Sequence, residues 1–194
     1  MNENAVKTAI MDATKKVVYE KKISGTSIRS IAKEAGVLSS HIQYYYATKH
    51  NLLDSLLIKT FQQLIDDRNA RLGDCDASLA GKLGAIIGLK KSNLKNKTTE
   101  SILFDFWIQS LIDDTFNKRY RDAYDSWRDD IRKILYEFHP DLDPEQAENL
   151  SYAMVSIMQG ATLQYYINDS FDLEKYFSFC MDMMLSTLKS KQDE

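Results

Sequence analysis

The sequence contains few of the residues that break helices or cross-link chains: two prolines, seven glycines and two cysteines among 194 residues. The isolated Cys75 and Cys180 exclude a disulfide-stapled secreted scaffold, and we expect them to fill space in a reducing compartment. Alternating apolar runs bounded by Asn-Gly or Asp-Gly turns are missing, which argues against a β-rich fold. No apolar run approaches the roughly 20 residues of a membrane span, and no amino-terminal secretion signal is evident. We therefore expect an all-α protein of the cytoplasm.

Charge is distributed unevenly along the chain. The formal net charge is −3, yet residues 1–52 hold eight Lys or Arg against four Asp or Glu, which leaves +4 on this part and −7 on the rest. A basic first part is suited to binding nucleic acid, and the acidic remainder would be repelled by the DNA phosphates. The length suits one small and one larger domain, which we place at residues 1–50 and 51–194.

Residues 26–49 are the most informative segment, because they have the pattern of two short helices joined by a tight turn. A hydroxyl at Thr26 or Ser27 can cap the first helix, and Gly36 fits the left-handed position just past its end. The apolar face of this helix consists of Ile28, Ile31, Ala32 and Ala35. The pattern is typical of a helix-turn-helix, whose second helix enters the major groove of DNA.

The second helix of the pair, expected over about residues 39–46, carries small polar and aromatic side chains on its outer face. Gln43 can bond an adenine edge in two places, and the hydroxyls can reach bases or phosphates. Lys49 would lie at the positive end of the next helix, which also attracts phosphate. A pair this short is unstable alone, so we expect flanking helices over residues 5–22 and 49–72 to hold it.

This segment resembles the amino-terminal domain of the TetR family of bacterial transcriptional regulators. The residues that match the family pattern at its spacing are Thr26, Ile31, Ala32, Ala35, Gly36, Val37, Ile42, Tyr45, Tyr46, Lys49 and Leu52. The family has a serine in place of Leu38, so the cap of the second helix moves to Ser39 or is lost. The resemblance implies an all-helical homodimer with a small DNA-binding domain, a larger ligand-binding and dimerisation domain, and repression relieved by a small molecule.

The resemblance also assigns contacts residue by residue. It implies phosphate contacts at Thr26, Ser27, Tyr45 and Lys49. It implies contacts in the DNA grooves at Ser39, Ser40, His41, Gln43 and Tyr44, and we add Arg29 to the predicted DNA-binding set. A two-fold symmetric dimer would read an inverted-repeat operator. The alternative interpretation is an ordinary helical hairpin whose polar face is only solvated.

Beyond residue 72 the apolar spacing predicts five more helices, about nine in all. They are expected at about Leu79–Lys90, Ser101–Ile112, Thr115–Phe138, Pro144–Ile167 and Leu173–Lys189. The polar run Lys90–Thr99 is the best candidate for a loop. At the start of the fourth of these helices, Asp143 is a predicted cap and Pro144 the first helical residue.

This larger part resembles the BetI-like branch of the same family, through Phe106-Trp107, Tyr120 to Arg128, Pro144 to Ala147 and Gly160. In that branch the corresponding helices line an effector cavity. The predicted ligand-binding residues are Phe104, Trp107, Tyr120, Tyr124, Trp127, Met154, Met158, Gln159 and Tyr165. Aromatic rings can surround a lipophilic ligand and favour a cationic one. The alternative is that these side chains form ordinary core.

The last two predicted helices each carry an apolar stripe of small and flexible residues. The stripes are Ala147, Leu150, Met154, Ile157, Met158 and Ala161, and then Phe177, Cys180, Met184 and Leu188. We expect them to pack against a second copy as a four-helix bundle, because one recognition helix alone binds too weakly to be specific. The alternative is that both stripes belong to the core of a single chain.

Two other functional classes remain to be weighed. An enzyme would have to use His139, Asp141 and Asp143, which fit a capped turn between helices better than a metal site. We therefore expect no catalytic residues, metal or cofactor. The other class is a DNA-bound scaffold or activator that recruits a protein partner, through the run 90–99 or the acidic surface, and senses no small molecule.

Overall fold

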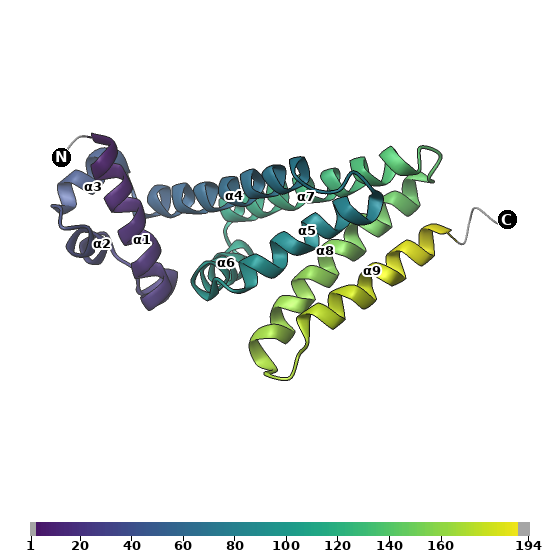
Figure 1. The fold of residues 1–194 in the computed structure, drawn as a ribbon. Coiled ribbons are helices and arrows are strands. Elements are labelled where there is room, and N and C mark those ends of the chain that lie inside the picture. The colour runs from purple at the N-terminus through teal and green to yellow at the C-terminus, as the bar shows by residue number, and fades with distance from the viewer. Residues whose placement is uncertain (1–2, 190–194) are drawn as a thin grey trace. The chain divides into compact units, whose positions relative to one another are not determined.

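The computed structural model describes residues 3–189, and every regular element in this range is a helix (Figure 1). In chain order the nine helices are α1 Glu3–Gly25, α2 Ile28–Ala35, α3 Ser39–Tyr45, α4 Lys49–Gly73, α5 Leu79–Leu94, α6 Lys97–Ser110, α7 Asp114–Phe138, α8 Pro144–Ile167 and α9 Leu173–Lys189. The predicted all-α class is confirmed.

The polar run Lys90–Thr99 is not a loop, and this prediction is wrong. Helix α5 continues through Leu94, which is buried, and α6 begins at Lys97. Lys90 itself is only 5% exposed. The side chain of Asn96 accepts a hydrogen bond from the backbone N–H of Thr99 at 3.2 Å and thereby caps α6. Lysines are good helix formers, so a polar run rich in lysine need not interrupt helical structure.

The chain divides into two compact units that differ from the predicted domains. The first unit consists of residues up to Leu64 together with Asn96–Arg121, and the second of Ile65–Lys95 together with the residues from Asp122 onward. The segment Asn96–Arg121 joins the first unit, in which α6 packs on α1. Helices α4 and α7 each contribute residues to both units. The functional division at residue 50 stays a prediction.

In the first unit, α1 holds the short helices α2 and α3 in place. The Lys16 ammonium on α1 lies 2.6 Å from the Glu34 carboxylate on α2, and the Lys7 ammonium lies 5.1 Å from the centre of the Tyr45 ring on α3. The buried side chains of this region come from all four amino-terminal helices: Ile10, Val17, Val18, Ile31, Ile42, Leu52 and Leu57. Packing by neighbours is what makes a seven-residue helix stable.

In the second unit, the predicted dimerisation stripes are part of the chain's own core. The buried members are Ala147, Leu150, Met154, Met158 and Ala161 on α8 and Phe177, Cys180, Met184 and Leu188 on α9, with Ile157 partly buried. These helices pack with α5 and α7, so the stripes are already covered. The prediction that these particular residues meet a second copy is therefore wrong, because helical periodicity cannot tell which partner covers an apolar face.

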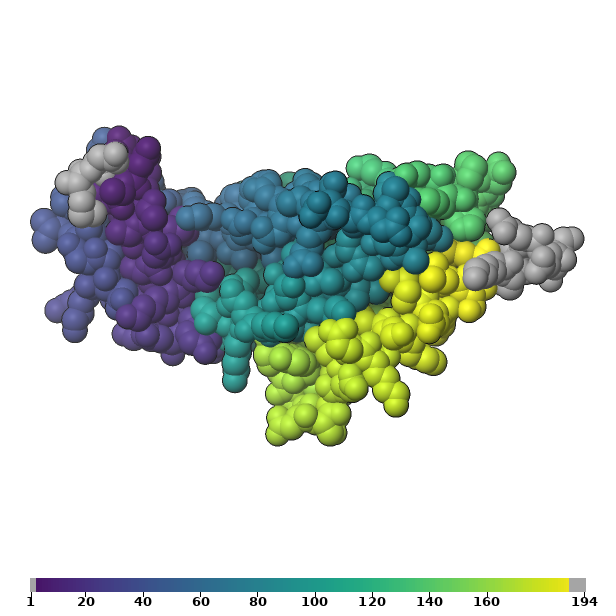
Figure 2. Space-filling model, in the orientation of Figure 1, coloured from purple at the N-terminus to yellow at the C-terminus, as the bar shows by residue number. Residues whose placement is uncertain are grey.

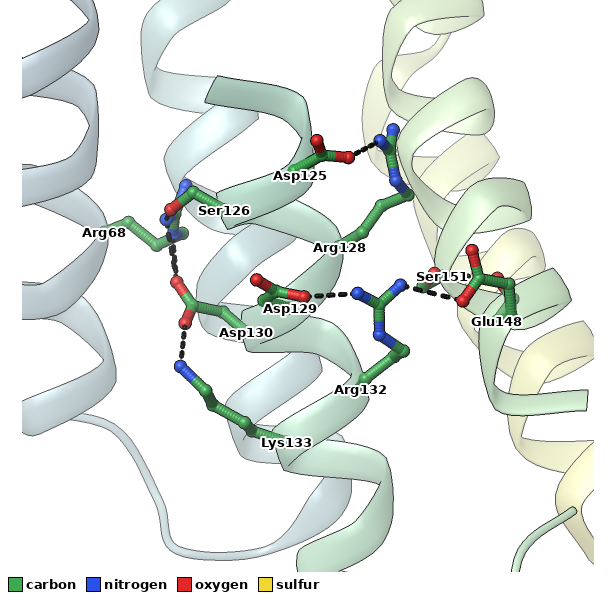
Figure 3. Close-up of polar contacts among 10 residues, drawn as sticks. All are labelled: Arg68, Asp125, Ser126, Arg128, Asp129, Asp130, Arg132, Lys133, Glu148 and Ser151. Atoms are coloured by element: carbon green, nitrogen blue, oxygen red, sulfur yellow. Dashed lines mark hydrogen bonds and ion pairs between the residues drawn. The ribbon is translucent and has the colours of Figure 1, made fainter. Parts of the chain in front are cut away.

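Polar contacts join α7 to its neighbours in the second unit (Figure 3). The Arg68 guanidinium on α4 donates to Asp130 at 2.8 Å and to Ser126 at 2.9 Å, although Arg68 is only 5% exposed. Toward α8, Arg132 donates to Glu148 at 3.2 Å. A buried guanidinium is tolerated only when it is paired and hydrogen-bonded, so these contacts define how α4 and α7 pack within this unit.

Candidate functional site

The helix pair α2–α3 has the caps that its turn requires at one helix only. Ser27 caps α2, because its hydroxyl accepts a hydrogen bond from the N–H of Ser30 at 3.1 Å. In return, the Ser30 hydroxyl accepts a hydrogen bond from the Ser27 N–H at 3.1 Å. Gly36 ends α2 with φ 65°, the left-handed conformation predicted for it. Leu38 precedes α3 and supplies no side-chain cap, so the cap of this helix is lost.

The outer face of α3 presents hydrogen-bonding side chains to solvent. Ser40, His41 and Gln43 are exposed, and Tyr44 is 82% exposed. Ile42 is fully buried and holds the helix against the unit. The structure therefore brings most of the predicted groove contacts together on one short surface.

The remaining predicted DNA contacts fall into two groups. Ser27 and Arg29 are exposed, while Ser39 and Tyr45 are half-buried beside the α3 surface. Thr26 is only 4% exposed, and its hydroxyl donates to the Lys22 carbonyl at 2.7 Å. Its position does not support the predicted phosphate contact, because its side chain is inside the unit.

The side chain of Lys49, the first residue of α4, binds backbone carbonyls at the end of α1 and just after it. Its ammonium donates to the carbonyl of Ile23 at 3.0 Å and to that of Thr26 at 2.8 Å. An ammonium has three donors, so two of them are already engaged by carbonyls before any phosphate is considered. Capping of α4 itself comes from Thr48, whose hydroxyl accepts from the Asn51 N–H at 3.0 Å.

Lys7 is a candidate DNA-facing residue that sequence reasoning missed. Its ammonium lies over the Tyr45 ring and 2.7 Å from the Glu3 carboxylate. The hydrogen bond to Glu3 raises the pKa of Lys7, and the half-buried Tyr46 has its own pKa raised by burial. Lys7 and Tyr45 are far apart in the chain, so only the packing of α1 beside α3 brings this charge to the site.

The predicted ligand-binding residues are divided between the two units. Phe104, Trp107 and Tyr120 belong to the first. There the Tyr120 hydroxyl donates to the Leu103 carbonyl and its ring meets Phe61 edge-on at 5.0 Å. Trp107 is 48% exposed. Tyr120 thus has a packing role within its unit, as the core alternative expected.

The other six predicted ligand residues belong to the second unit. Met154 and Met158 are buried in its core, and Tyr124 and Trp127 pack against that core with their rings 6.2 Å apart. The indole nitrogen Nε1 of Trp127 is buried and has no hydrogen-bond acceptor among the described residues. The other two, Gln159 and Tyr165, are half-buried. Buried donors normally have a partner, which makes this indole a point of interest for binding.

The acidic turn before α8 has the geometry of a helix cap. The Asp143 carboxylate accepts from the Gln146 N–H at 3.0 Å, and Pro144 is the first residue of α8. The backbone of His139 donates to the Leu135 carbonyl at 2.8 Å and so ends α7. In residues 3–189 no group of three or more metal-ligating side chains lies together, and no helix there is long and apolar enough to cross a membrane.

A helix pair with a tight turn at Gly36 and hydrogen-bonding side chains on its second helix, in an all-α chain with a basic first part, defines a DNA-binding regulator of the helix-turn-helix class. Two family comparisons agree. Residues 10–56 match the bacterial regulatory proteins of the tetR family, and residues 93–189 match the BetI-type transcriptional repressor, C-terminal domain. The chain belongs to the TetR family and has a BetI-type carboxy-terminal domain, as the sequence resemblance predicted.

Individual relatives point the same way. The chain is 28% identical over 158 residues to the HTH-type transcriptional regulator BetI of Klebsiella pneumoniae, covering 80% of this chain and 79% of that protein. It is 27% identical over 165 residues to BetI of Vibrio atlanticus, covering 84% and 80%. These relatives are regulators of transcription, and the chain is not an enzyme.

Solved structures share the fold. A putative transcriptional regulator from Pseudomonas aeruginosa PAO1 superposes with a TM-score of 0.86 at 16% identity, covering 98% of this chain and 93% of that one. A putative regulator from Saccharomonospora viridis, solved in complex with choline, gives a TM-score of 0.78 at 16% identity, covering 96% and 97%. At such identities the likeness concerns the fold alone.

Proposed function

We propose that this TetR-family regulator is a homodimeric repressor that reads an inverted-repeat operator with α3 and is released by a small molecule. The observation that carries the DNA-reading part is the exposed row Ser40, His41, Gln43 and Tyr44 on α3. Residues 1–50 would act as the DNA-binding domain and residues 51–194 as the effector and dimerisation domain. Because its partner is chromosomal DNA, we also propose that it works in the cytoplasm.

At the DNA, each exposed group has a distinct task. The Gln43 amide can donate to and accept from one adenine edge, and Ser40 and His41 can bond bases or phosphates nearby. Ser27, Arg29 and Tyr45 would contact phosphates, with Lys7 adding a positive charge beside Tyr45. Lys49 would act on DNA mainly by fixing the backbone between α1 and α2, since two of its donors are engaged there.

Dimerisation is supported by apolar side chains that remain exposed on α8 and α9. They are Tyr152, Leu163 and Ile167 on α8 and Phe179 and Met183 on α9. The outer side of α9, yellow in Figure 2, lies at the surface of the second unit. Exposed apolar patches on ordered helices commonly mark protein interfaces. A two-fold pair would have to present its two α3 helices one DNA turn apart, about 34 to 36 Å.

The proposed effector lies in the second unit, beside Tyr124, Trp127, Met154 and Met158. Aromatic faces attract cations, and methionines adapt to the shape of a ligand. The buried Trp127 N–H favours a ligand that also offers a hydrogen-bond acceptor, such as a hydroxyl or carbonyl oxygen. The choline bound by the Saccharomonospora viridis neighbour makes small hydroxylated cations the first compounds to test. Gln159 and Tyr165, which belong to the same unit, keep their predicted ligand roles as part of this proposal. Phe104, Trp107 and Tyr120 belong to the first unit and are not part of the proposed site.

Release of DNA would follow from a difference in affinity. A ligand that binds one conformation of the second unit better than another shifts the equilibrium between them by no more than the difference in its binding free energies. Helix α4 begins immediately after the helix pair and continues into the second unit, so a change there is passed along a continuous helix. A mismatch in the separation of the two α3 helices would then weaken one half-site.

The experiment is selection of duplexes from a random pool by the purified protein, followed by titration of choline and related cations. We expect the selected duplexes to contain an inverted repeat and the protein to sediment on them as a dimer. A compound should release the protein from this DNA, and it should bind the Trp127→Phe variant more weakly than the unmodified protein. Trp127→Phe removes the N–H but keeps an aromatic ring. Failure to bind any duplex at low salt, or binding only as a monomer, would overturn the proposal.

A second candidate is a DNA-bound scaffold or activator with a protein partner and no small-molecule effector. The run 90–99 offers no docking loop, because all of it except Lys95 and Asn96 lies in α5 and α6. An apolar surface at the end of α6 favours this candidate instead: Trp107, Ile108, Leu111 and Ile112 are all exposed. If no ligand alters DNA binding while Leu111→Asp abolishes regulation with DNA affinity unchanged, this second candidate replaces the first.

A further inference from the structure

The end of α1, from Lys22 to the residue before the cap of α2, contains an unusual backbone conformation. Lys22 has φ 61° and ψ 168°, and within residues 3–189 it is the one residue other than glycine with a positive φ. Residues with a Cβ rarely adopt this region, and they do so only where surrounding contacts hold them there. The contacts that hold Lys22 therefore determine how the chain enters the DNA-reading helix pair.

Helix α6 holds this segment. The backbone N–H of the buried Ile23 donates to the Asp105 carboxylate at 2.6 Å, and the Lys22 ammonium donates to the Ser101 hydroxyl at 2.7 Å. Ser101 and Asp105 are four residues apart and so lie on the same face of α6. A bond from an N–H to a carboxylate is charge-assisted and stronger than one to a neutral oxygen.

Helix α4 also contacts this segment. The Lys49 ammonium binds the Ile23 and Thr26 carbonyls, and the Thr26 hydroxyl closes back on the Lys22 carbonyl. Ile23 thus donates to an anion from α6 and accepts from a cation on α4. The next residue after this segment, Ser27, caps α2. These bonds therefore determine where the helix pair begins.

We infer that Asp105 is a positioning residue for DNA binding: through the Ile23 N–H, α6 holds the kink at Lys22 and thereby the placement of α2 and α3. The inference rests on the proposed reading of DNA by α3. A displacement of α6 beyond hydrogen-bond reach removes the acceptor from Ile23. Lys22 then relaxes toward an ordinary helical conformation, and the helix pair leaves its DNA-binding position.

The test uses a duplex selected from a random pool by the unmodified protein, with affinities measured at one fixed salt concentration. Asp105→Leu removes the acceptor at similar size, and we expect a loss of affinity of about tenfold or more. Asp105→Asn keeps an oxygen that accepts from Ile23, so its loss stays within about threefold. Asp169→Leu, at an exposed aspartate between α8 and α9, is the matched control and leaves affinity unchanged.

A double-mutant cycle separates positioning from general damage. Glycine adopts positive φ without strain, so in the Lys22→Gly background the same Asp105→Leu change costs about threefold or less. Equal losses in both backgrounds, or full affinity in Asp105→Leu, would overturn the inference. If Asp105→Leu does not fold, Asp105→Ser, whose hydroxyl is too short to reach Ile23, takes its place in the cycle.

Hydrogen exchange at the Ile23 amide provides a readout without DNA. We expect this amide to exchange about tenfold faster in Asp105→Leu than in the unmodified protein and Asp105→Asn. Unchanged exchange contradicts the role of Asp105 whatever the protein does with DNA. If the unmodified protein selects no duplex while the amide responds as expected, the proposed function fails and the bond between α6 and the segment stands.

Discussion

Both units join α4 to α7 with an arginine–aspartate ion pair, and the two pairs differ in their exposure to water. In the first unit Arg119 donates to the two carboxylate oxygens of Asp54 at 2.9 and 3.0 Å, and its side chain is 33% exposed. In the second unit the Arg68 side chain, paired with Asp130, is 6% exposed. Water can replace a lost partner at the first pair but hardly at the second. The contacts between α4 and α7 are therefore easier to rearrange in the first unit, which contains the DNA-reading helices, than in the second.

The interiors of the two units also differ in the kind of contact that holds them. The first unit depends on several bonds to particular backbone atoms, such as those of Asp105 and Lys49 to Ile23. The second unit depends on a continuous apolar core drawn from α5, α7, α8 and α9. Directional bonds fix the position of a small polar surface, whereas an apolar core with flexible methionines can adapt to a ligand.

The largest expected effect concerns the buried pair. Asp130→Ala leaves the Arg68 guanidinium buried beside Ser126 alone, and we expect the free energy of unfolding to fall by about 3 to 5 kcal/mol. Urea unfolding measures it. The double variant Arg68→Met with Asp130→Ala removes both charges and should recover most of the loss. A loss below about 1 kcal/mol for Asp130→Ala would mean that water reaches this pair and that the two units do not differ.

The next effect should appear in DNA binding and not in stability. Gln43→Ala removes an exposed amide from α3, so we expect affinity for the selected duplex to fall by about 1 to 3 kcal/mol, with relaxed preference at one base pair. The unfolding free energy should stay unchanged. Gln164→Ala, an exposed glutamine on α8, is the control. Equal effects of both variants on DNA affinity would contradict the proposal that the first unit, and not the second, contacts DNA.

The half-buried pair Arg119–Asp54 should matter less than the pair with the buried arginine. For Asp54→Ala we expect a loss of about 1 kcal/mol in unfolding free energy, because Arg119 regains water as a partner. The comparison with Asp130→Ala in the same urea experiment is the decisive measurement. Loss should shrink further at high salt for Asp54→Ala and remain for Asp130→Ala, since buried charges are screened little.

The smallest expected effect is a dependence on acid. Burial acts to raise the pKa of Asp113, but the Phe116 N–H and the His50 imidazole, 2.8 Å away, outweigh it and lower the pKa below its ordinary value of 3.8. The ionised carboxylate therefore stabilises the folded state above that pH, and the contribution is lost as the pH falls through the lowered pKa. Acid unfolding followed by circular dichroism should show Asp113→Asn less stable than the unmodified protein at pH 7 and equal to it near about pH 2. A constant difference across this range would contradict the assigned shift.

Local sequence signals predicted the helices well where caps and breakers are strong. The observed bounds of α8 and α9 equal those expected, because Asp143 and Pro144 start one helix and a polar turn separates it from the next. Gly36 likewise ended α2 as predicted. The run 90–99 does not form the expected loop, since most of its lysines lie on two helices whose buried sides the sequence does not reveal.

The sequence by itself determined the helical class, the helix pair with its turn at Gly36, and the family, because these depend on neighbours within a few residues and on a pattern of matched positions. Only the tertiary structure decided which neighbours cover each apolar stripe, that the Lys49 ammonium binds backbone carbonyls, and that Asp105 reaches Ile23. The bonds from Lys49 and Asp105 to Ile23 join residues 26 and 82 positions apart in the chain. Helical periodicity states that a side chain will be covered, and packing alone selects the group that covers it.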